Sequence, residues 1–319
     1  MARDNRIDTL KGLLIILVIL GHIIIATDNA NTVNHALMGL IYVFHMPLFI
    51  LISGYLTKNP EEQPAREMWR GVGNIFITLV IFQLITAIRK HFQDDEFLTT
   101  LIKFPYGILW YLMCLIYWRI ALYFTPKKLL NNPILHLVIA LALSLLCGLT
   151  HLGNLLAIQR TLNFYVFFLL GYYYRQGCIN QKWWHMNYLH LATAVILLPL
   201  IFWLYPRCGN FMNGADHYTL ADLPQKALIL TCSVALSLLV FNLVVEFKAL
   251  SHIGKDSLFY YLYHSILVFA VFTPALQTFD LPRTLPYILL YTLVTVGILF
   301  LMSKIRFFKW LMNPFKKLN

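Results

Sequence analysis

The first apolar segment of the chain carries the residues with the clearest chemical potential. Asp8, Lys11 and His22 share one stripe of a helix, since about 20° separates Lys11 from His22 and about 40° separates Asp8 from His22. The stripe leads from a charged end to an imidazole about 16 Å deeper. Ionisable groups in hydrocarbon are expensive and mark functional candidates, so we predict that His22 and Asp8 are catalytic. The alternative is that Asp8 and Lys11 mark the membrane interface and His22 hydrogen-bonds a neighbouring helix.

A second imidazole lies next to a helix kink in the segment Phe44-His45-Met46-Pro47. Pro47 frees a backbone carbonyl one turn earlier, and neighbours or water must satisfy that carbonyl within the bilayer. His45 is therefore predicted to line a cavity, with a structural hydrogen bond at the kink as the alternative. The following pair Ser53-Gly54 forms a small surface that favours close helix packing.

A third imidazole stands on a polar helix face near the C-terminus. Ser257, Tyr260 and Tyr261 fall within about 60° of His264 on a helix. We predict that His264 takes part in catalysis by orienting a substrate or sharing a proton. The alternative is an ordinary hydrogen-bond network in the core.

Arginine and aromatic side chains offer two binding positions. Arg66 and Arg70 are four apart, on one helix face, and guanidinium forks suit phosphate. Arg160 and the pair Trp110-Tyr111 are predicted to bind the acceptor of a transferred chemical group. The aromatic pair would serve as a platform on which a sugar ring stacks. The alternatives are positive-inside flanking for Arg66 and Arg70, lipid headgroup contact for Arg160, and an aromatic belt for Trp110 and Tyr111.

Metal and nucleotide motifs are absent from the sequence. No zinc, P-loop or dinucleotide motif occurs, and the cysteines have no CxxC spacing. We expect no metal site, and we interpret the cysteines as small apolar fillers. They are Cys114, Cys147, Cys178, Cys208 and Cys232.

The composition shows which elements must position these residues. The 319-residue chain is 59% hydrophobic and 12% charged, with a mean hydropathy of +0.67. Soluble domains are about 25% charged, so an ordinary soluble enzyme is excluded. The apolar blocks have the length of ~20 residues that crosses a bilayer and predict an all-α, polytopic membrane protein with about ten transmembrane helices. The predicted spans are 10–28, 36–57, 70–89, 107–125, 133–151, 161–175, 188–205, 224–246, 256–277 and 284–303.

The placement of basic residues predicts the orientation. With the N-terminus inside, 18 of the 25 Lys and Arg residues fall in cytoplasmic segments and 7 in outer segments. This bias predicts that both termini are cytoplasmic. It also accounts for the net charge of +11, so we expect no nucleic-acid partner. The polar segment 206–223 is predicted to be an outer loop that helps to gather a polar ligand.

The motifs together resemble the integral-membrane acyltransferase-3 family, in particular its fucose 4-O-acetylase-like branch. The resemblance rests on Arg6-Ile-Asp8-Thr-Leu-Lys11-Gly12, on Gly21-His22, and on Phe44 to Phe49 (FHMPLF) with Ser53-Gly54-Tyr55. Leu109 to Leu112, Arg160 to Gly171 and Ser257 to His264 extend it over nearly the whole chain.

The resemblance implies a ten-helix bundle in the bacterial inner membrane, here one transmembrane acyltransferase domain over residues 1–319. The essential histidine of the family maps onto His22, and its usual arginine eleven residues earlier is Lys11 here, which keeps the charge but lacks the fork. The paired arginines of the family map onto Arg66 and Arg70, with a spacing one residue longer than RxxR.

The prediction from these observations is an O-acetyltransferase. It moves an acetyl group from cytoplasmic acetyl-CoA to a hydroxyl of a cell-envelope or surface-polysaccharide sugar, which is lipid-linked in some family members. Lys11, Arg66, Arg70 and His45 are assigned to the acyl-CoA donor. One alternative keeps the enzyme but uses succinyl-CoA or another acyl donor. Another is a transporter or flippase of a lipid-linked sugar, against which stands the lack of an inverted repeat.

Overall fold

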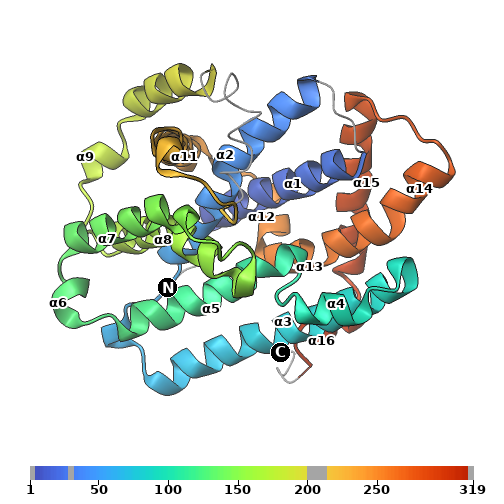
Figure 1. The fold of residues 1–319 in the computed structure, drawn as a ribbon, viewed down its shortest axis with the longest axis horizontal. Helices are drawn as coiled ribbons and strands as arrows, with labels where there is room; N and C mark the ends of the chain where they lie inside the picture. The colour runs from blue at the N-terminus through green and yellow to red at the C-terminus, as the bar shows by residue number, and fades with distance from the viewer. Residues whose placement is uncertain (1–3, 28–31, 200–213, 315–319) are drawn as a thin grey trace. The chain divides into compact units, whose positions relative to one another are not determined.

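The computed structural model describes residues 4–27, 32–199 and 214–314, and these residues form helices joined by loops, with no strand among them (Figure 1). The chain divides into two compact units, each of which is described by itself. The first unit comprises residues 1–45, 80–102 and 244–319, and the second comprises residues 46–79 and 103–243.

Every predicted span overlaps a helical stretch of the described chain, and positions 28 and 200–205 of the first and seventh spans lie outside the described residues. Eight stretches are long and apolar enough to cross a membrane, which confirms the polytopic helical fold. The predicted fifth and seventh spans correspond to shorter apolar stretches, Pro133–Leu149 and Asn187–Pro199. The main helices are α1 (Asn5–Thr27), α2 (Thr32–Tyr55), α3 (Ala65–Asp94), α5 (Trp110–Phe124), α7 (Pro133–Leu146), α8 (Ile158–Arg175), α11 (Leu223–Leu243), α13 (Ser257–Leu267) and α15 (Leu285–Met302). The shorter ones are α4 (Phe97–Ile102), α6 (Lys127–Leu130), α9 (Gln181–Trp184), α12 (Lys248–Lys255), α14 (Thr273–Thr278) and α16 (Arg306–Met312).

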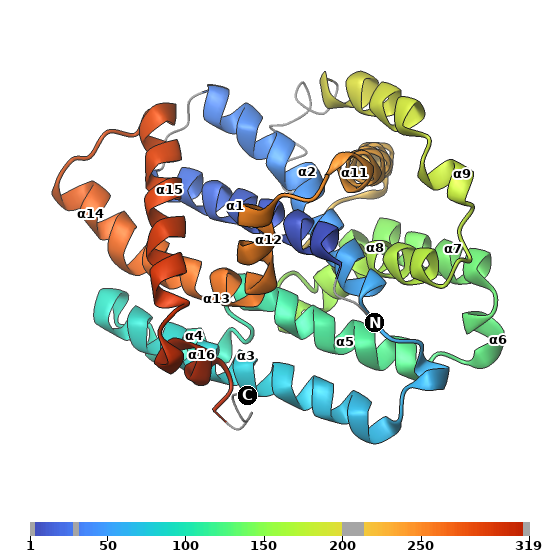
Figure 2. The ribbon, with the colours of Figure 1, turned by 180° about the vertical axis from the view of Figure 1, so that it is seen from behind.

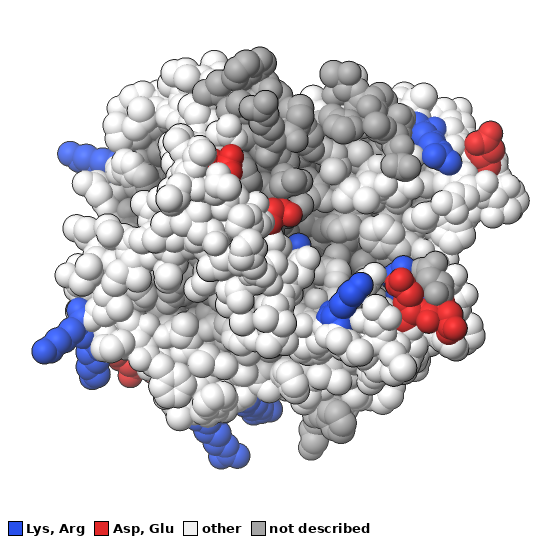
Figure 3. Space-filling model, viewed as in Figure 1, with Lys and Arg blue, Asp and Glu red and all other residues white. Residues whose placement is uncertain are grey.

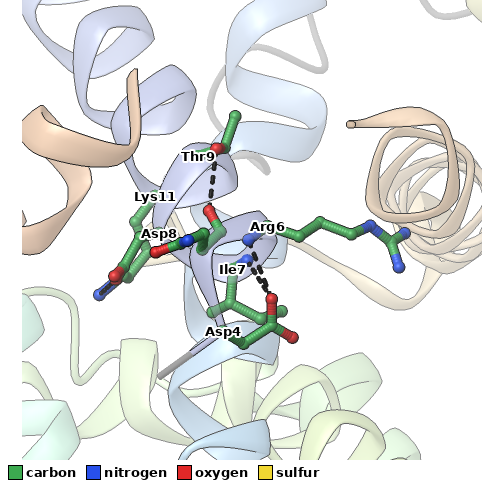
Figure 4. A network of polar contacts seen from close by, with 7 residues as sticks. Asp4, Arg6, Ile7, Asp8, Thr9 and Lys11 are labelled. Carbon is green, nitrogen blue, oxygen red and sulfur yellow. Dashed lines mark hydrogen bonds and ion pairs between the residues drawn. The ribbon is translucent and has the colours of Figure 1, made fainter. Parts of the chain in front are cut away.

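In the first unit, α1 is fixed at its start by a side-chain cap and by close packing on α12. Asp4 Oδ1 accepts hydrogen bonds from the backbone N–H groups of Arg6, at 2.9 Å, and Ile7, at 3.3 Å (Figure 4). This is the arrangement of an N-cap. Glycines allow α1 and α12, side by side in Figure 2, to touch: a Cβ on Gly12 would lie 2.0 Å from the carbonyl oxygen of Leu250. The charged end of the α1 stripe is therefore held in one position.

In the second unit, α2 packs against α8 through two glycines. A Cβ on Gly54 would lie 1.8 Å from the carbonyl oxygen of Phe168, and one on Gly171 would lie 1.8 Å from that of Leu51. Both positions therefore require glycine. The prediction that Ser53-Gly54 receives a closely packed helix is confirmed.

The exposed side chains of several helices are apolar. Ile134 on α7 is 77% exposed, and Leu293 and Leu301 on α15 are 68% and 67% exposed. On the face drawn in Figure 3 the described surface is mostly uncharged. Apolar side chains that water would disfavour are stable against lipid tails, in agreement with a membrane location.

The cysteines follow the apolar-filler prediction in part. Cys114, Cys147 and Cys232 are buried, as predicted. Cys178 is exposed, so the filler interpretation is wrong for this residue, which follows α8 in a polar loop. Cys208 lies outside the described residues.

Candidate active site

His22 lies on α1, half-buried, with a fixed ring orientation. Its Nδ1 is 2.8 Å from the carbonyl oxygen of Val18, one turn earlier. A carbonyl oxygen can only accept, so Nδ1 carries the hydrogen and the neutral ring has its lone pair on Nε2. The helix itself therefore sets the tautomer that a general base needs.

His264 on α13 lies directly against His22. The two ring centroids are 4.9 Å apart with an interplanar angle of 66°. Nδ1 of His264 is 3.1 Å from the carbonyl oxygen of Tyr260, which again leaves the lone pair on Nε2. That Nε2 atom is buried and has no hydrogen-bond partner. A buried polar atom without a partner is costly, so this atom is suited to receive a hydrogen bond during the reaction.

His45 on α2 adds a third imidazole to the first unit. It is buried, its Nδ1 is 2.7 Å from the carbonyl oxygen of Ile41, and its ring lies 4.9 Å from that of Tyr42. The structure thus places His22 against His264, and His45 within electrostatic range of His22.

A π-helical turn, η6 (Val268–Phe272), follows α13 and brings a ring to the same place. The ring of Phe269 lies 5.9 Å from that of His22, edge to face. Two side chains bond to carbonyl oxygens of this turn: Gln93 Nε2 donates to Phe269 at 2.9 Å, and Thr273 Oγ1 donates to Val268 at 3.0 Å. Single π turns occur often at functional sites, and the sequence shows no signal for this one.

Asp8 and Lys11 form an ion pair at the beginning of α1. Lys11 Nζ is 2.7 Å from Asp8 Oδ1, and the two side chains are 15% and 4% exposed (Figure 4). Of the two partners that the sequence leaves open for Asp8, Lys11 or a cation on the acyl-CoA side, the structure has Lys11. Asp8 is 14 residues from His22, a rise of about 21 Å along the helix, so it does not orient the imidazole. A Cβ on Gly254 would lie 1.7 Å from the carbonyl oxygen of Asp8, so α12 packs tightly here.

In the second unit, Arg66 and Arg70 lie in the first two turns of α3. Both side chains are exposed, and neither forms an ion pair within the described chain. They share a helix face as predicted. Their guanidinium groups are thus available to an anionic ligand.

The predicted acceptor-binding residues take different positions. The guanidinium of Arg160 lies 5.1 Å from the centroid of the Trp110 ring, which stacks on Phe164 at 5.5 Å. Tyr111, by contrast, is 5% exposed, and its hydroxyl is 2.7 Å from Ser53 Oγ. Arg160 and Trp110 thus lie together in one stack of side chains, whereas the Tyr111 hydroxyl links α5 to α2.

The sequence interpretation missed two charged residues next to Arg160. Lys226 on α11 is 1% exposed, and its Nζ donates to Asn163 Oδ1 at 2.6 Å. Asp216 has a buried Oδ2 without a partner and lies in electrostatic range of Arg160 and Lys226. Burial raises the pKa of its carboxyl against the opposing effect of these two cations. Lys226 lies inside the predicted span 224–246, so its position as an ionisable residue in a span was the available signal.

Comparisons with known proteins agree with these features. The protein-family model described as an acyltransferase domain (Acyl_transf_3) matches residues 4–304. The chain is also similar to nodulation protein NolL of Sinorhizobium fredii (strain NBRC 101917 / NGR234), with 43% identity over 82 residues, 25% of this chain and 22% of that protein. NolL of Mesorhizobium japonicum (strain LMG 29417 / CECT 9101 / MAFF 303099) is 38% identical over 82 residues, 25% of this chain and 21% of that protein.

These matches differ in what they cover. The matched segment spans about a fifth of the length of the two curated relatives. No solved structure matches the chain. The family model, in contrast, extends over nearly all of it, from the N-cap of α1 to the residues just after α15. The chain therefore belongs to the acyltransferase-3 family.

Proposed function

We propose that this chain is a membrane O-acetyltransferase that moves an acetyl group from cytoplasmic acetyl-CoA to a hydroxyl of a cell-envelope or surface-polysaccharide sugar. The contact between His22 and His264 is the observation that carries the proposal. Both rings have their basic Nε2 free of backbone bonds, and family membership supports acyl transfer as the chemistry.

In the proposed reaction, His22 is the general base. Its Nε2 takes the proton of the acceptor hydroxyl while the hydroxyl oxygen attacks the thioester carbonyl. The carbon–oxygen bond forms, the carbon–sulfur bond breaks, and the CoA sulfur receives the proton from the imidazolium. An ester and free CoA result. General base catalysis of this kind is worth about 10²–10⁴-fold.

His264 stabilises the charged form of His22. Between the two proton transfers, the lone pair on its buried Nε2 can accept a hydrogen bond from Nε2–H of the protonated His22, whose ring lies in contact with it. A hydrogen bond to an ionised group is about twice as strong as a neutral one. A second version of the step passes through an acetyl-His22 intermediate. Nε2 of His22 attacks the thioester carbonyl, and the carbon–sulfur bond breaks to release the CoA thiolate. The hydroxyl oxygen then attacks the acetyl group and the bond to Nε2 breaks, while His264 accepts the hydroxyl proton, which passes on to the thiolate.

The donor and the acceptor are assigned to separate sets of residues. Arg66 and Arg70 bind the phosphates of CoA, with Lys11 and His45 as further donor-side residues. Lys11 forms an ion pair with Asp8, so we expect it to contribute less to donor binding than Arg66 and Arg70 do. On the acceptor side we propose Arg160 and Trp110, with Tyr111 holding α5 in place. We also propose that the chain belongs to the fucose 4-O-acetylase-like branch of the family and that its location is the bacterial inner membrane.

The test is the replacement of His22. His22→Ala should lower transfer from radiolabelled acetyl-CoA to envelope glycan by at least about 100-fold. His252→Ala is the matched control, because His252 makes the same bond to the carbonyl one turn earlier, at 2.8 Å, but is exposed. Wild-type acetylation in His22→Ala would reject the assignment.

The same preparation separates the alternatives. Label transfer from succinyl-CoA but not from acetyl-CoA would favour the other acyl donor. Movement of a lipid-linked sugar across the membrane without any consumption of acyl-CoA would favour the flippase and reject the enzyme.

A further inference from the structure

Arg119 on α5 is a charged residue within a predicted span to which the proposed mechanism gives no role. The side chain lies against α3: a Cβ on Gly71 would be 3.5 Å from Nη1 of Arg119. The rings of Trp69 and Phe124, 6.3 Å apart, hold the same parts of α3 and α5 together, and Figure 1 shows the two helices running side by side. Arg119 therefore contacts the helical turn of α3 that begins directly after Arg70.

One nitrogen of the Arg119 guanidinium has no hydrogen-bond partner in the described chain, although the group lies within electrostatic range of the Tyr111 hydroxyl. This nitrogen, Nε, is buried. No ion pair of Arg119 occurs among the described residues. Burying a charged donor without a partner costs more than burying a neutral one. A guanidinium with a buried, unbonded Nε–H is suited to bind an anionic ligand through its planar set of N–H donors.

Acidic residues near this end of the second unit are already paired with lysines. Glu67 is 2.6 Å from Lys58 Nζ, and Glu61 is 3.3 Å from Lys127 Nζ. Arg70 directly precedes Gly71, the position that Arg119 contacts, and Arg66 lies one turn earlier; both are exposed on the first turns of α3. Three guanidinium groups on two adjacent helices thus face no carboxylate partner within the described chain. The count of basic residues predicts that this end is cytoplasmic.

We propose that Arg119, with Arg66 and Arg70, forms a binding site for phosphate esters, and that its ligand is the nucleotide part of the acyl donor. This inference rests on the proposed function for the identity of the ligand. Arg66 and Arg70 alone are in water, where salt weakens phosphate contacts. Arg119 supplies a contact that is partly desolvated and geometrically fixed, and bidentate arginine–phosphate contacts are the strong ones.

The experiment measures binding and not turnover. The purified protein in zwitterionic phosphatidylcholine nanodiscs is titrated with adenosine 3′,5′-bisphosphate, a soluble fragment of CoA. Arg119→Gln should raise the dissociation constant at least about tenfold, the effect expected for the loss of one charge-assisted hydrogen bond. Arg119→Lys, which keeps the charge but not the fork, should lie between the two. Lys128→Gln, which removes an exposed charge after the same helix, should stay within about twofold of wild type.

Several results would overturn the inference. One is a dissociation constant of Arg119→Gln within twofold of wild type, with a folded protein confirmed by size exclusion. If Arg119→Gln does not fold, unchanged binding by Arg119→Lys has the same meaning. A lipid headgroup is the other source of phosphate. If Arg119 matters only in nanodiscs with anionic phosphatidylglycerol, the residue binds lipid and the proposal is wrong.

The variant His22→Gln distinguishes failure of the phosphate site from failure of the proposed acetyl-transfer function. This variant should bind the nucleotide as wild type does, because His22 belongs to the other unit and has no assigned phosphate contact. If wild type binds the nucleotide through Arg119 but transfers no acyl group, the proposed function fails and the phosphate site stands. If transfer occurs and Arg119→Gln binds normally, only the phosphate site fails.

Discussion

Replacement of His264 is the most direct test of the paired imidazoles. His264→Phe keeps an aromatic ring of similar size against His22 but removes the Nε2 acceptor. The lost interaction is a hydrogen bond to the protonated ring of His22, worth about 1.5–3 kcal/mol. At about 1.4 kcal/mol for each factor of ten, kcat should fall about 10- to 150-fold. This interaction exists only when His22 carries the proton, so kcat and kcat/KM should fall equally and KM for acetyl-CoA should not change.

A second variant and a stability measurement distinguish this role from packing. His264→Gln retains an oxygen that can accept a hydrogen bond and should recover part of the lost rate. His264→Phe should remain about as stable as wild type, because it loses the Tyr260 bond but also removes a buried unpartnered nitrogen. The assay is acetyl transfer from labelled acetyl-CoA by the purified protein, with the thermal midpoint measured in parallel. Full activity of His264→Phe would show that His264 is a packing residue and would refute the paired-imidazole reasoning.

Two further predictions concern stability. Gly254→Ala should destabilise the first unit by about 1–3 kcal/mol or more, because its Cβ would lie 1.7 Å from the carbonyl oxygen of Asp8. Gly297→Ala, whose Cβ would meet nothing within 4 Å, should be neutral or slightly stabilising; equal thermal midpoints for both variants would contradict this. Because burial raises the pKa of Asp216, the folded state holds this proton to a higher pH than the unfolded state, so stability falls as pH rises above about 3.9. Asp216→Asn should therefore gain thermal stability relative to wild type between pH 4 and pH 7, and a difference independent of pH would disprove it.

The sequence predicts the helices better than it predicts the site. Apolar blocks of bilayer length need no long-range information, and every predicted span overlaps a helical stretch of the described chain. The Asp8–Lys11 pair is also local, three residues apart on one helix, and could be predicted. The meeting of His22 with His264 could not, because 242 residues separate them and helix periodicity gives a face but not its neighbour.

Charged residues near helix ends were the most difficult to interpret. Arg119 and Lys226 lie inside the predicted spans 107–125 and 224–246, but in the sequence they contribute only to the count of basic residues that predicts orientation. Their neighbours, Gly71 for Arg119 and Asn163 for Lys226, come from other helices. Only packing shows that Lys226 is buried and that Arg119 has an unpartnered nitrogen.

The way in which the histidines are oriented has a consequence for catalysis in a bilayer. Many hydrolytic enzymes hold the catalytic imidazole with a carboxylate. Here the carbonyl oxygens of Val18 and Tyr260 hold His22 and His264, and the nearest acidic residue on α1, Asp8, is about 21 Å along the helix. A carbonyl fixes the tautomer without placing a charge at membrane depth, where a buried charge is expensive.

The reactants of the proposed step are then all neutral: a hydroxyl, a thioester and two imidazoles. Charge first develops in the transition state, on the attacked carbonyl and on His22. In a medium of low dielectric constant, a polar group fixed in advance stabilises such charge more than mobile water does. The unpartnered Nε2 of His264 is a group of this kind, because its cost is borne by the folded protein before the substrates bind. His264 should therefore affect kcat and leave substrate binding unchanged, and the kinetic constants of His264→Phe test this difference.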